Sequence, residues 1–222
     1  EAIMAIAKEY NLYVIEDNAQ AIGANCKFSD GTKKKAGTIG HVGATSFFPS
    51  KNLGCYGDGG AIFTNDDALA HKLRGIVNHG MYERYHHDVV GVNSRLDSIQ
   101  AAVLNAKLPL LDEYGRARQD AARKYSATFE GHKNIVAPSI CDICDCHVFH
   151  QYTLRIIDAD RNGLMQHLLD KGIPCAIYYP IPLHSQKAYA DSRYKEEDFP
   201  VTNQLVTEVL SLPMHTELDD EP

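Results

Sequence analysis

Two residues with reactive side chains, Asp17 and Lys51, each follow a short apolar run. The run Leu12–Ile15 precedes Asp17, and in open α/β sheets the ligand crevice lies beyond the carboxyl ends of the strands. Lys51 stands in a turn containing Pro, Ser and Gly after the run Ala44–Phe48. Partial desolvation there favours the free amine that forms a Schiff base. Taken alone, Asp17 is better explained as a solvated charge at a strand end, and a surface position is the usual one for a lysine such as Lys51.

The segment that follows Lys51 is rich in glycine, with four glycines in the seven residues 54–60. Glycine permits positive φ angles and a close approach of the backbone to a ligand. Neither the G-x-G-x-x-G spacing nor the G-x-x-x-x-G-K-[ST] spacing is present. The sequence therefore disfavours a dinucleotide site and a P-loop.

The hydrophobic pattern predicts an α/β region followed by a smaller α+β lobe beyond Gly115. Helical spacing covers most of residues 1–10, and Pro109 is a candidate kink in a long amphipathic helix. The expected strands are residues 12–15, 44–48, 61–64, 152–157 and 174–178. The expected helices are residues 1–10, 66–77, 96–110 and 161–169. Residues 24–40 and 79–92 are expected to be loops.

Composition narrows the class of protein. The chain has 222 residues, 44% hydrophobic and 23% charged, which is typical of a globular protein. The net charge of −7 and the absence of a basic face argue against nucleic-acid binding. No apolar run approaches the roughly 18 residues that span a bilayer. With no secretory leader, the six cysteines are interpreted as reduced thiols of a cytoplasmic protein.

The sequence contains two clusters of potential metal ligands. Cys141, Cys144, Cys146 and His147 form a C-x-x-C-x-C-H pattern, but no second C-x-x-C completes a zinc site, so free thiols in a variable loop are favoured over metal. The pair His86–His87 is favoured as part of a substrate-facing loop. The sequence therefore predicts no metal.

The chain begins inside an expected helix and stops where another helix is expected to begin. No capping residue precedes the helical spacing that begins at residue 1. Residues 216–221 resemble a cap with an acidic first turn, after which the chain stops. We expect the sequence to be a fragment that lacks the N-terminal part of a longer protein.

Five motifs in a fixed order resemble the DegT/DnrJ/EryC1/StrS family of sugar-nucleotide aminotransferases, over essentially the whole chain. They are Glu16-Asp17-Asn18-Ala19-Gln20, Ser46–Gly54 with Gly57-Asp58-Gly59-Gly60, Gly91–Leu96 with Ile99–Ala102, Tyr179–His184, and Ser211–His215. The resemblance implies the aspartate-aminotransferase fold (fold type I) and the cofactor pyridoxal 5′-phosphate (PLP). Residues 1–115 would be part of the large PLP-binding domain, and residues 116–222 the small domain.

The resemblance also implies roles for individual residues. Lys51 matches the lysine that carries the cofactor and moves a proton, and Asp17 matches the partner of the pyridine nitrogen. Gln20 is similar to the residue that bonds the ring's O3′, and Ser46 to a phosphate ligand. Asn93 resembles a phosphate ligand supplied across a homodimer interface, which implies an active site shared between two chains.

One branch of the family is particularly similar in its sequence around Lys51 and in residues 84–97. Its members aminate C3 of UDP-2-acetamido-2-deoxy-3-oxo-glucuronate for surface polysaccharide such as O-antigen. Arg95 is the candidate partner for the substrate carboxylate, with a helix-start ion pair as the alternative. Tyr85, His86, Tyr178 and Tyr179 are further candidate substrate contacts.

The expected function is therefore transfer of an amino group, with glutamate as donor, to a 3-oxo nucleotide sugar. The branch is expected to have His-Tyr-Pro where this chain has Tyr178-Tyr179-Pro180, so a dTDP-linked 3-oxo sugar remains an alternative. A dehydratase of the same family is disfavoured, because that branch has histidine at the Lys51 position. A non-catalytic fragment with the same fold is the remaining alternative.

Overall fold

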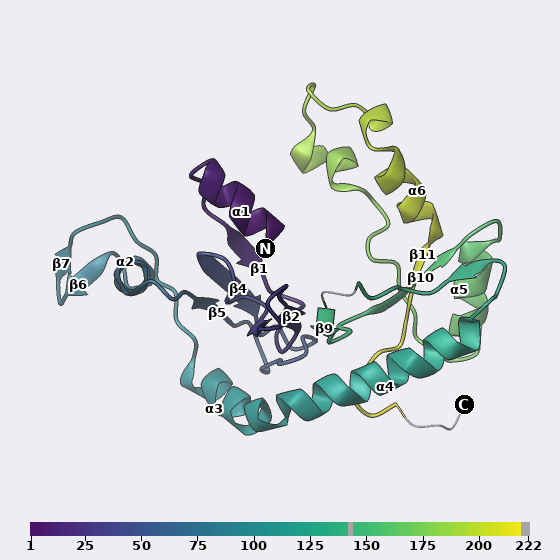
Figure 1. Ribbon diagram of the computed structural model, residues 1–222, viewed down its shortest axis with the longest axis horizontal. Helices are drawn as coiled ribbons and strands as arrows, with labels where there is room; N and C mark the ends of the chain where they lie inside the picture. Colours follow the sequence, from purple (N-terminus) through teal and green to yellow (C-terminus); the bar gives the residue numbers. More distant parts are fainter. Residues whose placement is uncertain (142–143, 219–222) are drawn as a thin grey trace. The chain divides into compact units, whose positions relative to one another are not determined.

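The computed structural model describes residues 1–141 and 144–218, which divide into two compact units (Figure 1). Unit 1 comprises Glu1–Arg116 and the described part of Cys141–His150. Unit 2 comprises Ala117–Ile140 and the described residues from Gln151 onward. A boundary at residue 115, as the sequence suggests, would assign residues 141–150 to the other part of the chain. The domain division itself remains a prediction.

The central sheet of unit 1 has the strand order β1-β4-β5. Strand β1 (Ile15–Asp17) pairs in parallel with β4 (Val42–Ser46), and β4 pairs antiparallel with β5 (Gly60–Phe63). The predicted first strand lay at residues 12–15, so the structure shifts it toward the carboxylates. Strand β4 pairs with both of its neighbours and is therefore the central strand of the sheet. The turn containing Lys51 directly follows this central strand.

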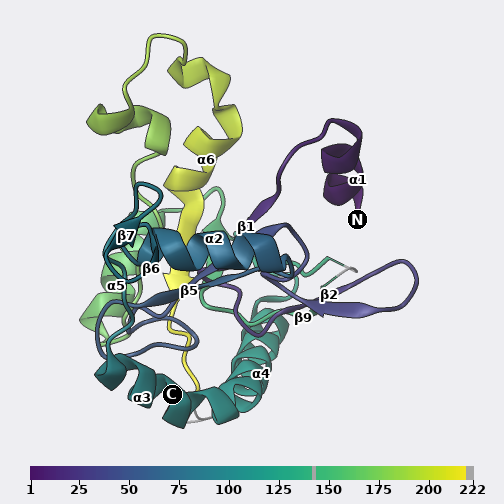
Figure 2. The ribbon, with the colours of Figure 1, turned by 90° about the vertical axis from the view of Figure 1, so that its left-hand side faces the viewer.

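Helices α1 (Ala2–Glu9) and α2 (Asp67–Val77) flank this sheet in the sequence. The Asp66 carboxylate caps α2 by accepting a hydrogen bond from the Leu69 amide at 2.9 Å. The predicted helix over residues 66–77 is thus confirmed. The β6–β7 hairpin (Met81–Glu83 and His86–His87) follows α2 and lies beside it (Figure 2).

The expectation of a loop over residues 24–40 is wrong, because this segment contains two strands. Strand β2 (Asn25–Lys27) pairs antiparallel with β3 (Lys33–Lys35) and with β9 (Cys144–Cys146). The partner β9 comes from a distant part of the sequence, and local patterns carry no signal for such pairing. The expected loop over 79–92 likewise contains the β6–β7 hairpin.

The long amphipathic helix breaks at the predicted position. Helix α3 (Ser98–Lys107) is followed by a 3₁₀ turn, η1 (Leu108–Leu110), that contains Pro109, and α4 (Leu111–Phe129) continues the path. Proline lacks the N–H required to continue an α-helical ladder, which accounts for the break. Helix α4 extends well past Gly115, where the sequence suggested a change of texture.

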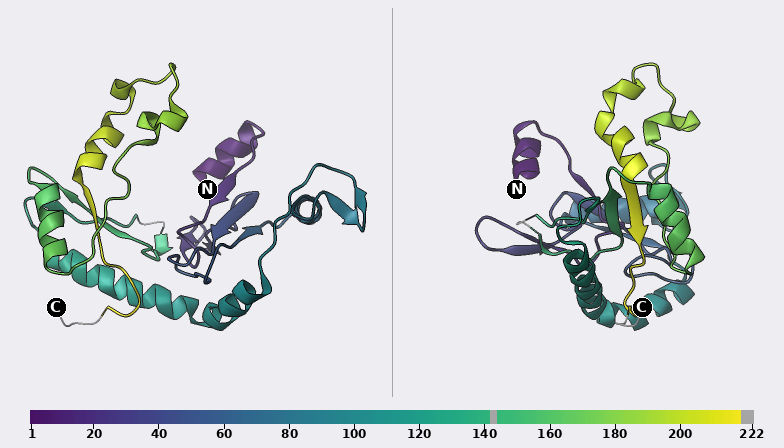
Figure 3. Two further views of the ribbon diagram at one scale, coloured as in Figure 1. Left: turned by 180° about the vertical axis from the view of Figure 1, so that it is seen from behind. Right: turned by 90° about the vertical axis from the view of Figure 1, so that its right-hand side faces the viewer.

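Unit 2 contains a three-stranded sheet of order β11-β10-β8. Its strands are Val209–Leu212, Tyr152–Ile156 and Ile135–Val136. Helices α5 (Arg161–Asp170) and α6 (Pro200–Glu208) pack on this sheet (Figure 3). Three short 3₁₀ helices lie between them, η2 (Leu183–Ser185), η3 (Lys187–Tyr189) and η4 (Glu196–Asp198). The strand predicted at 174–178 is only an isolated bridge between Ala176 and Ser211.

Each unit has its own apolar core. In unit 1, Phe47, Leu53, Cys55 and Leu104 are buried together. In unit 2, Tyr152 is fully buried and its hydroxyl is 2.8 Å from the Ser126 hydroxyl. None of the helices in the described part of the chain is both long and apolar enough to cross a membrane. The helix start expected at residues 216–221 lies partly outside the described residues.

We predict that Gly43→Ala destabilises unit 1 by about 1–3 kcal/mol, because an added Cβ would overlap the backbone of Gly37. Urea unfolding followed by circular dichroism measures the change. Gly115→Ala is the control, because a Cβ there meets nothing within 4 Å and alanine favours the helix. Equal unfolding free energies for the two variants would contradict the prediction.

Candidate active site

The carboxyl ends of β1 and β4 bring predicted site residues to one edge of the sheet. Asp17, the last residue of β1, lies opposite Ala44, and Ser46 ends β4 two residues further on. Lys51 follows five residues later. Parallel pairing therefore places Asp17 and Ser46 at the same edge, just before the turn that carries Lys51, as the sequence indicated.

Buried backbone contacts fix the strand end next to Asp17. The Asn18 amide donates to the Ala44 carbonyl at 2.8 Å, and the Thr45 hydroxyl donates to the Asn18 carbonyl at 3.0 Å. Asn18 is 1% exposed and Thr45 is 7% exposed. Because these hydrogen bonds are shielded from water, they hold β1 and β4 in register at the point where the ladder ends.

The Glu16 carboxylate has a structural role that the sequence did not reveal. It accepts hydrogen bonds from the amides of Gly37, Ile39 and Gly40 at 2.8, 2.6 and 2.6 Å. These amides belong to the segment that leads into β4. One carboxylate thus joins both strands of the parallel pair, while its neighbour Asp17 remains exposed.

The turn that carries Lys51 is tightly held, whereas its amine is not. The Lys51 amide donates to the Phe48 carbonyl at 2.9 Å, and the Cys55 amide closes the turn by donating to the Phe47 carbonyl at 2.8 Å. Lys51 itself is half-buried. No hydrogen bond or ion pair joins its amine to another described residue, so the nitrogen is available for reaction.

The other polar groups at this edge also have unused hydrogen-bonding capacity. The Asp17 carboxylate accepts one hydrogen bond, from the Ala19 amide at 3.0 Å. The Ser46 hydroxyl oxygen accepts one from the Phe48 amide at 3.2 Å, which leaves its proton to donate. Gln20 is exposed. The edge thus presents a carboxylate, a hydroxyl, an amide and, in the adjoining turn, an amine.

The glycine-rich turn after Lys51 is held by two residues of α3 that sequence reasoning missed. The Gln100 side chain accepts a hydrogen bond from the Tyr56 amide at 2.8 Å. The Lys107 ammonium donates to the Gly54 carbonyl at 2.7 Å and lies 5.3 Å from the centre of the Tyr56 ring. Their spacing along α3 is a helical repeat, but nothing local shows that their partners lie in the glycine turn.

The β6–β7 region carries three of the predicted contact residues, all exposed. Asn93 forms an isolated bridge with Asn78, and its side-chain amide bonds no other described residue. Tyr85 has a φ of 69°, and its ring centre lies 4.8 Å from the Arg84 guanidinium carbon. His86 is the first residue of β7. These side chains are accessible to a ligand or to another chain.

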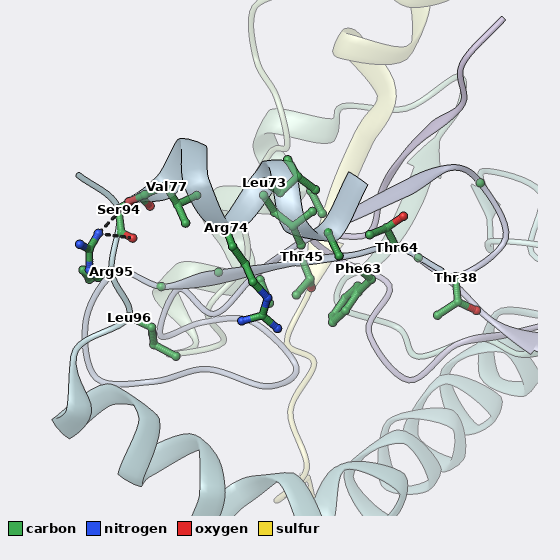
Figure 4. Close-up of a pocket in the computed structure, with 18 of the residues that line it drawn as sticks. Thr38, Thr45, Phe63, Thr64, Leu73, Arg74, Val77, Ser94, Arg95 and Leu96 are labelled. Atoms are coloured by element: carbon green, nitrogen blue, oxygen red, sulfur yellow. Dashed lines mark hydrogen bonds between the residues drawn. The ribbon is translucent and has the colours of Figure 1, made fainter. Parts of the chain in front are cut away.

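Arg95 is engaged within unit 1. Its guanidinium donates to the Val77 carbonyl at 2.7 Å (Figure 4). It also donates to the Asn78 side-chain oxygen at 2.5 Å. These bonds tie the start of the α3 segment to the end of α2. Its role as a ligand for a substrate carboxylate stays a prediction, and that role would require the guanidinium to share or exchange these partners.

A cavity of about 960 Å³ lies between β5 and α2 (Figure 4). Its lining includes Arg74, which extends from α2 into the hollow, together with Ser94, Arg95 and the Gly59–Gly60 pair. Asp17, Gln20 and Lys51 do not line it. These three groups therefore lie outside the lining of the cavity, which includes Ala44 and Thr45 of β4 and Asp58–Gly60 of the glycine turn.

Tyr178 and Tyr179 lie in unit 2 and are exposed, with ring centres 5.6 Å apart.

The cysteine cluster lies in unit 1, where Cys26 of β2 is opposite Cys144 of β9. No disulfide joins two of the described cysteines, and burial raises the pKa of the Cys144 thiol. Among residues 1–141 and 144–218, no group of three or more His, Cys, Asp or Glu side chains is arranged to hold a metal ion.

The ordered sheet edge with its carboxylate and lysine defines the class of the protein, and solved structures agree. The chain has part of the aspartate-aminotransferase fold. It superposes with a TM-score of 0.89 on a DegT DnrJ EryC1 StrS aminotransferase from Brucella abortus, at 42% identity, covering 98% of this chain and 56% of that one.

The family model for the DegT/DnrJ/EryC1/StrS aminotransferase family matches residues 1–222, and the chain belongs to this family. Relatives include a pleiotropic regulatory protein of Geobacillus stearothermophilus, 47% identical over all of this chain and 58% of the relative. A UDP-2-acetamido-2-deoxy-3-oxo-D-glucuronate aminotransferase of Pseudomonas aeruginosa is 47% identical over 99% of this chain and 58% of the relative.

A dTDP-3-amino-3,6-dideoxy-alpha-D-galactopyranose transaminase of Aneurinibacillus thermoaerophilus is 43% identical over 96% of this chain and 56% of the relative. The chain thus spans little more than half the length of the curated relatives it matches.

We predict that Arg95→Lys loosens residues 78–94, because a single ammonium cannot reproduce the two-pronged contact with Val77 and Asn78. Amide hydrogen exchange of this segment should accelerate by the equivalent of about 1 kcal/mol. Arg74→Lys is the matched control, since the Arg74 guanidinium bonds no other described residue. Unchanged exchange in Arg95→Lys would leave Arg95 free for a substrate.

Proposed function

We propose that this chain is the lysine-bearing part of a PLP-dependent aminotransferase that acts on a 3-oxo nucleotide sugar. The observation that carries the proposal is the sheet edge formed by Asp17 and Ser46, followed by a rigid turn with an unpartnered lysine amine. Membership of the aminotransferase family supports the same conclusion.

The groups at this edge fit pyridoxal phosphate chemically. A phosphorylated pyridine aldehyde needs an amine for its aldehyde, a carboxylate for its ring nitrogen and hydrogen-bond donors for its phosphate. Lys51 offers the amine, Asp17 offers a carboxylate oxygen without a donor, and Ser46 offers a hydroxyl proton. Gln20 would donate to the ring's phenolic oxygen.

When bound, the cofactor supplies an electron sink for the carbon from which a proton is removed. Asp17 would hold a proton on the ring nitrogen and so keep the ring electron-poor. Lys51, once displaced by the amino donor, would move the proton between the donor's α-carbon and the cofactor. The Phe48 and Cys55 hydrogen bonds keep the lysine backbone fixed while its side chain moves.

We further propose a homodimer with shared active sites. Asn93 is exposed, and its side-chain amide is without a described partner, so it can reach a phosphate held by a second copy of the chain. Tyr85 and His86 would meet the sugar nucleotide from the same segment. Glutamate is the proposed amino donor, and the proposed location is the cytoplasm.

The proposed substrate is UDP-2-acetamido-2-deoxy-3-oxo-glucuronate, whose amination serves surface polysaccharide such as O-antigen. Similarity to the Pseudomonas aeruginosa aminotransferase supports it. Arg95 would bind the uronate carboxylate, and Tyr178 with Tyr179 would contact the sugar. A dTDP-linked 3-oxo-deoxyhexose is the second candidate, favoured by the Tyr178-Tyr179-Pro180 sequence and by the Aneurinibacillus relative.

Incubation with PLP followed by borohydride reduction tests the proposal, because reduction fixes the cofactor on the lysine that holds it. We predict modification concentrated at Lys51, located by peptide mass spectrometry, and its loss in Lys51→Arg. The exposed run Lys33–Lys35 reports non-specific labelling in the same digest. Equal labelling of that run and of Lys51 would contradict the proposal and favour a non-catalytic fragment.

We predict that Asp17→Asn weakens PLP binding about ten-fold, because a neutral amide gives up the charge-assisted hydrogen bond to the protonated ring nitrogen. The fraction of Lys51 fixed by borohydride, measured against PLP concentration, gives the apparent Kd. Asp58→Asn, in the exposed part of the glycine turn, is the matched control. An unchanged Kd in Asp17→Asn would remove Asp17 from the cofactor site.

A further inference from the structure

We infer that His150 is a positioning residue for Lys51 and that it acts through the buried side chain of Asn52. The inference rests on the proposed function, because the value of a fixed Lys51 lies in its reaction with the cofactor. His150 lies far from Lys51 in the sequence, yet both belong to unit 1. Asn52, the residue directly after Lys51, connects them.

Two hydrogen bonds hold the Asn52 side chain. Its Nδ2 donates to the Val148 carbonyl at 2.8 Å, and its Oδ1 lies 3.1 Å from Nδ1 of His150. Because Nδ2 must face the carbonyl, Oδ1 is the acceptor toward the imidazole. The His150 Nδ1 therefore donates to the Asn52 Oδ1.

Burial makes these bonds matter. Asn52 is only 7% exposed, and a buried amide that loses its hydrogen-bond partners destabilises the folded chain. The next residue, Leu53, is 3% exposed and belongs to the apolar core of unit 1. The backbone on the carboxyl side of Lys51 is thus held by a polar anchor and an apolar anchor in succession. Loss of the two Asn52 side-chain hydrogen bonds would free the residue that directly follows Lys51 in the chain.

The anchor is itself supported by a strand. Val148 and His150 follow β9, which pairs with β2 through Asn25–Cys146 and Cys26–Cys144. Val148 is 4% exposed. The Asn52 contacts therefore join the lysine turn to the segment that directly follows β9.

The experiment compares His150→Leu, which removes the donor, with His150→Asn, whose amide can still donate at the place of Nδ1. His147→Leu is the matched control, since the His147 ring accepts a hydrogen bond from the Phe149 amide instead and lies in the same segment. The full 222-residue chain is used without cofactor and then with PLP.

Three readouts are recorded. In the cofactor-free chain, amide hydrogen exchange of residues 51–55 reports the order of the turn. Acetic anhydride labelling of Lys51 against pH, relative to exposed Lys72, reports access to the amine. The rate at which PLP is fixed on Lys51 by borohydride reports productive positioning.

We expect His150→Leu to speed exchange of residues 51–55 about ten-fold and to slow fixation of PLP about ten-fold, while acetylation of Lys51 stays level or rises. His150→Asn should restore both rates to within about two-fold of the parent. Slower PLP fixation with undiminished acetylation separates misplacement of the amine from its burial.

Parent-like exchange of residues 51–55 in His150→Leu would overturn the inference, as would equal effects of His147→Leu. Uniformly faster exchange along the whole chain would also overturn it, because His150 would then support the fold in general. Failure of the parent chain to take PLP at Lys51 would count against the proposed function alone, since exchange and acetylation of the cofactor-free chain still decide the role of His150.

Discussion

The parallel pairing of β1 with β4 determines how the strand ends of the candidate site lie within unit 1. Parallel strands need a long crossover, and residues 18–41 supply it with the β2–β3 hairpin in place of the usual helix. The Glu16 carboxylate binds three amides at the end of this crossover and so closes it onto β1. With the register fixed, Asp17 and Ser46 share an edge, and the turn with Lys51 begins there.

The residues that end strands could be predicted from the sequence, because short apolar runs followed by polar residues and glycine mark such ends locally. Asp17 and Lys51 were identified in this way, Ser46 was identified from the family resemblance, and the structure brings the ends of β1 and β4 together. The Pro109 break and the start of α2 at Asp66 were also predictable, since each depends on the chemistry of one residue.

The residues that hold the lysine turn could not be predicted, because their partners are distant in the sequence. Gln100, Lys107 and Asn52 are of types that are usually exposed, and only the tertiary fold brings backbone carbonyls and amides to them. The same limit applies to the lysine-rich strand β3, whose composition resembles a loop. Arg95 shows the converse case, in which a residue assigned to a substrate also has a place within the fold.

The groups that hold the lysine turn in place are different from the amine that is proposed to react. The rigidity of the turn comes from backbone hydrogen bonds, the buried Asn52 amide and the packing of Leu53, and none of these involves the Lys51 amine. A counter-ion on the amine would also have fixed it, but would have favoured the charged form, which is not nucleophilic. In the proposed function, fixing the backbone beside Lys51 would position the lysine without a partner on its amine, and the side chain would keep the freedom to leave and to return.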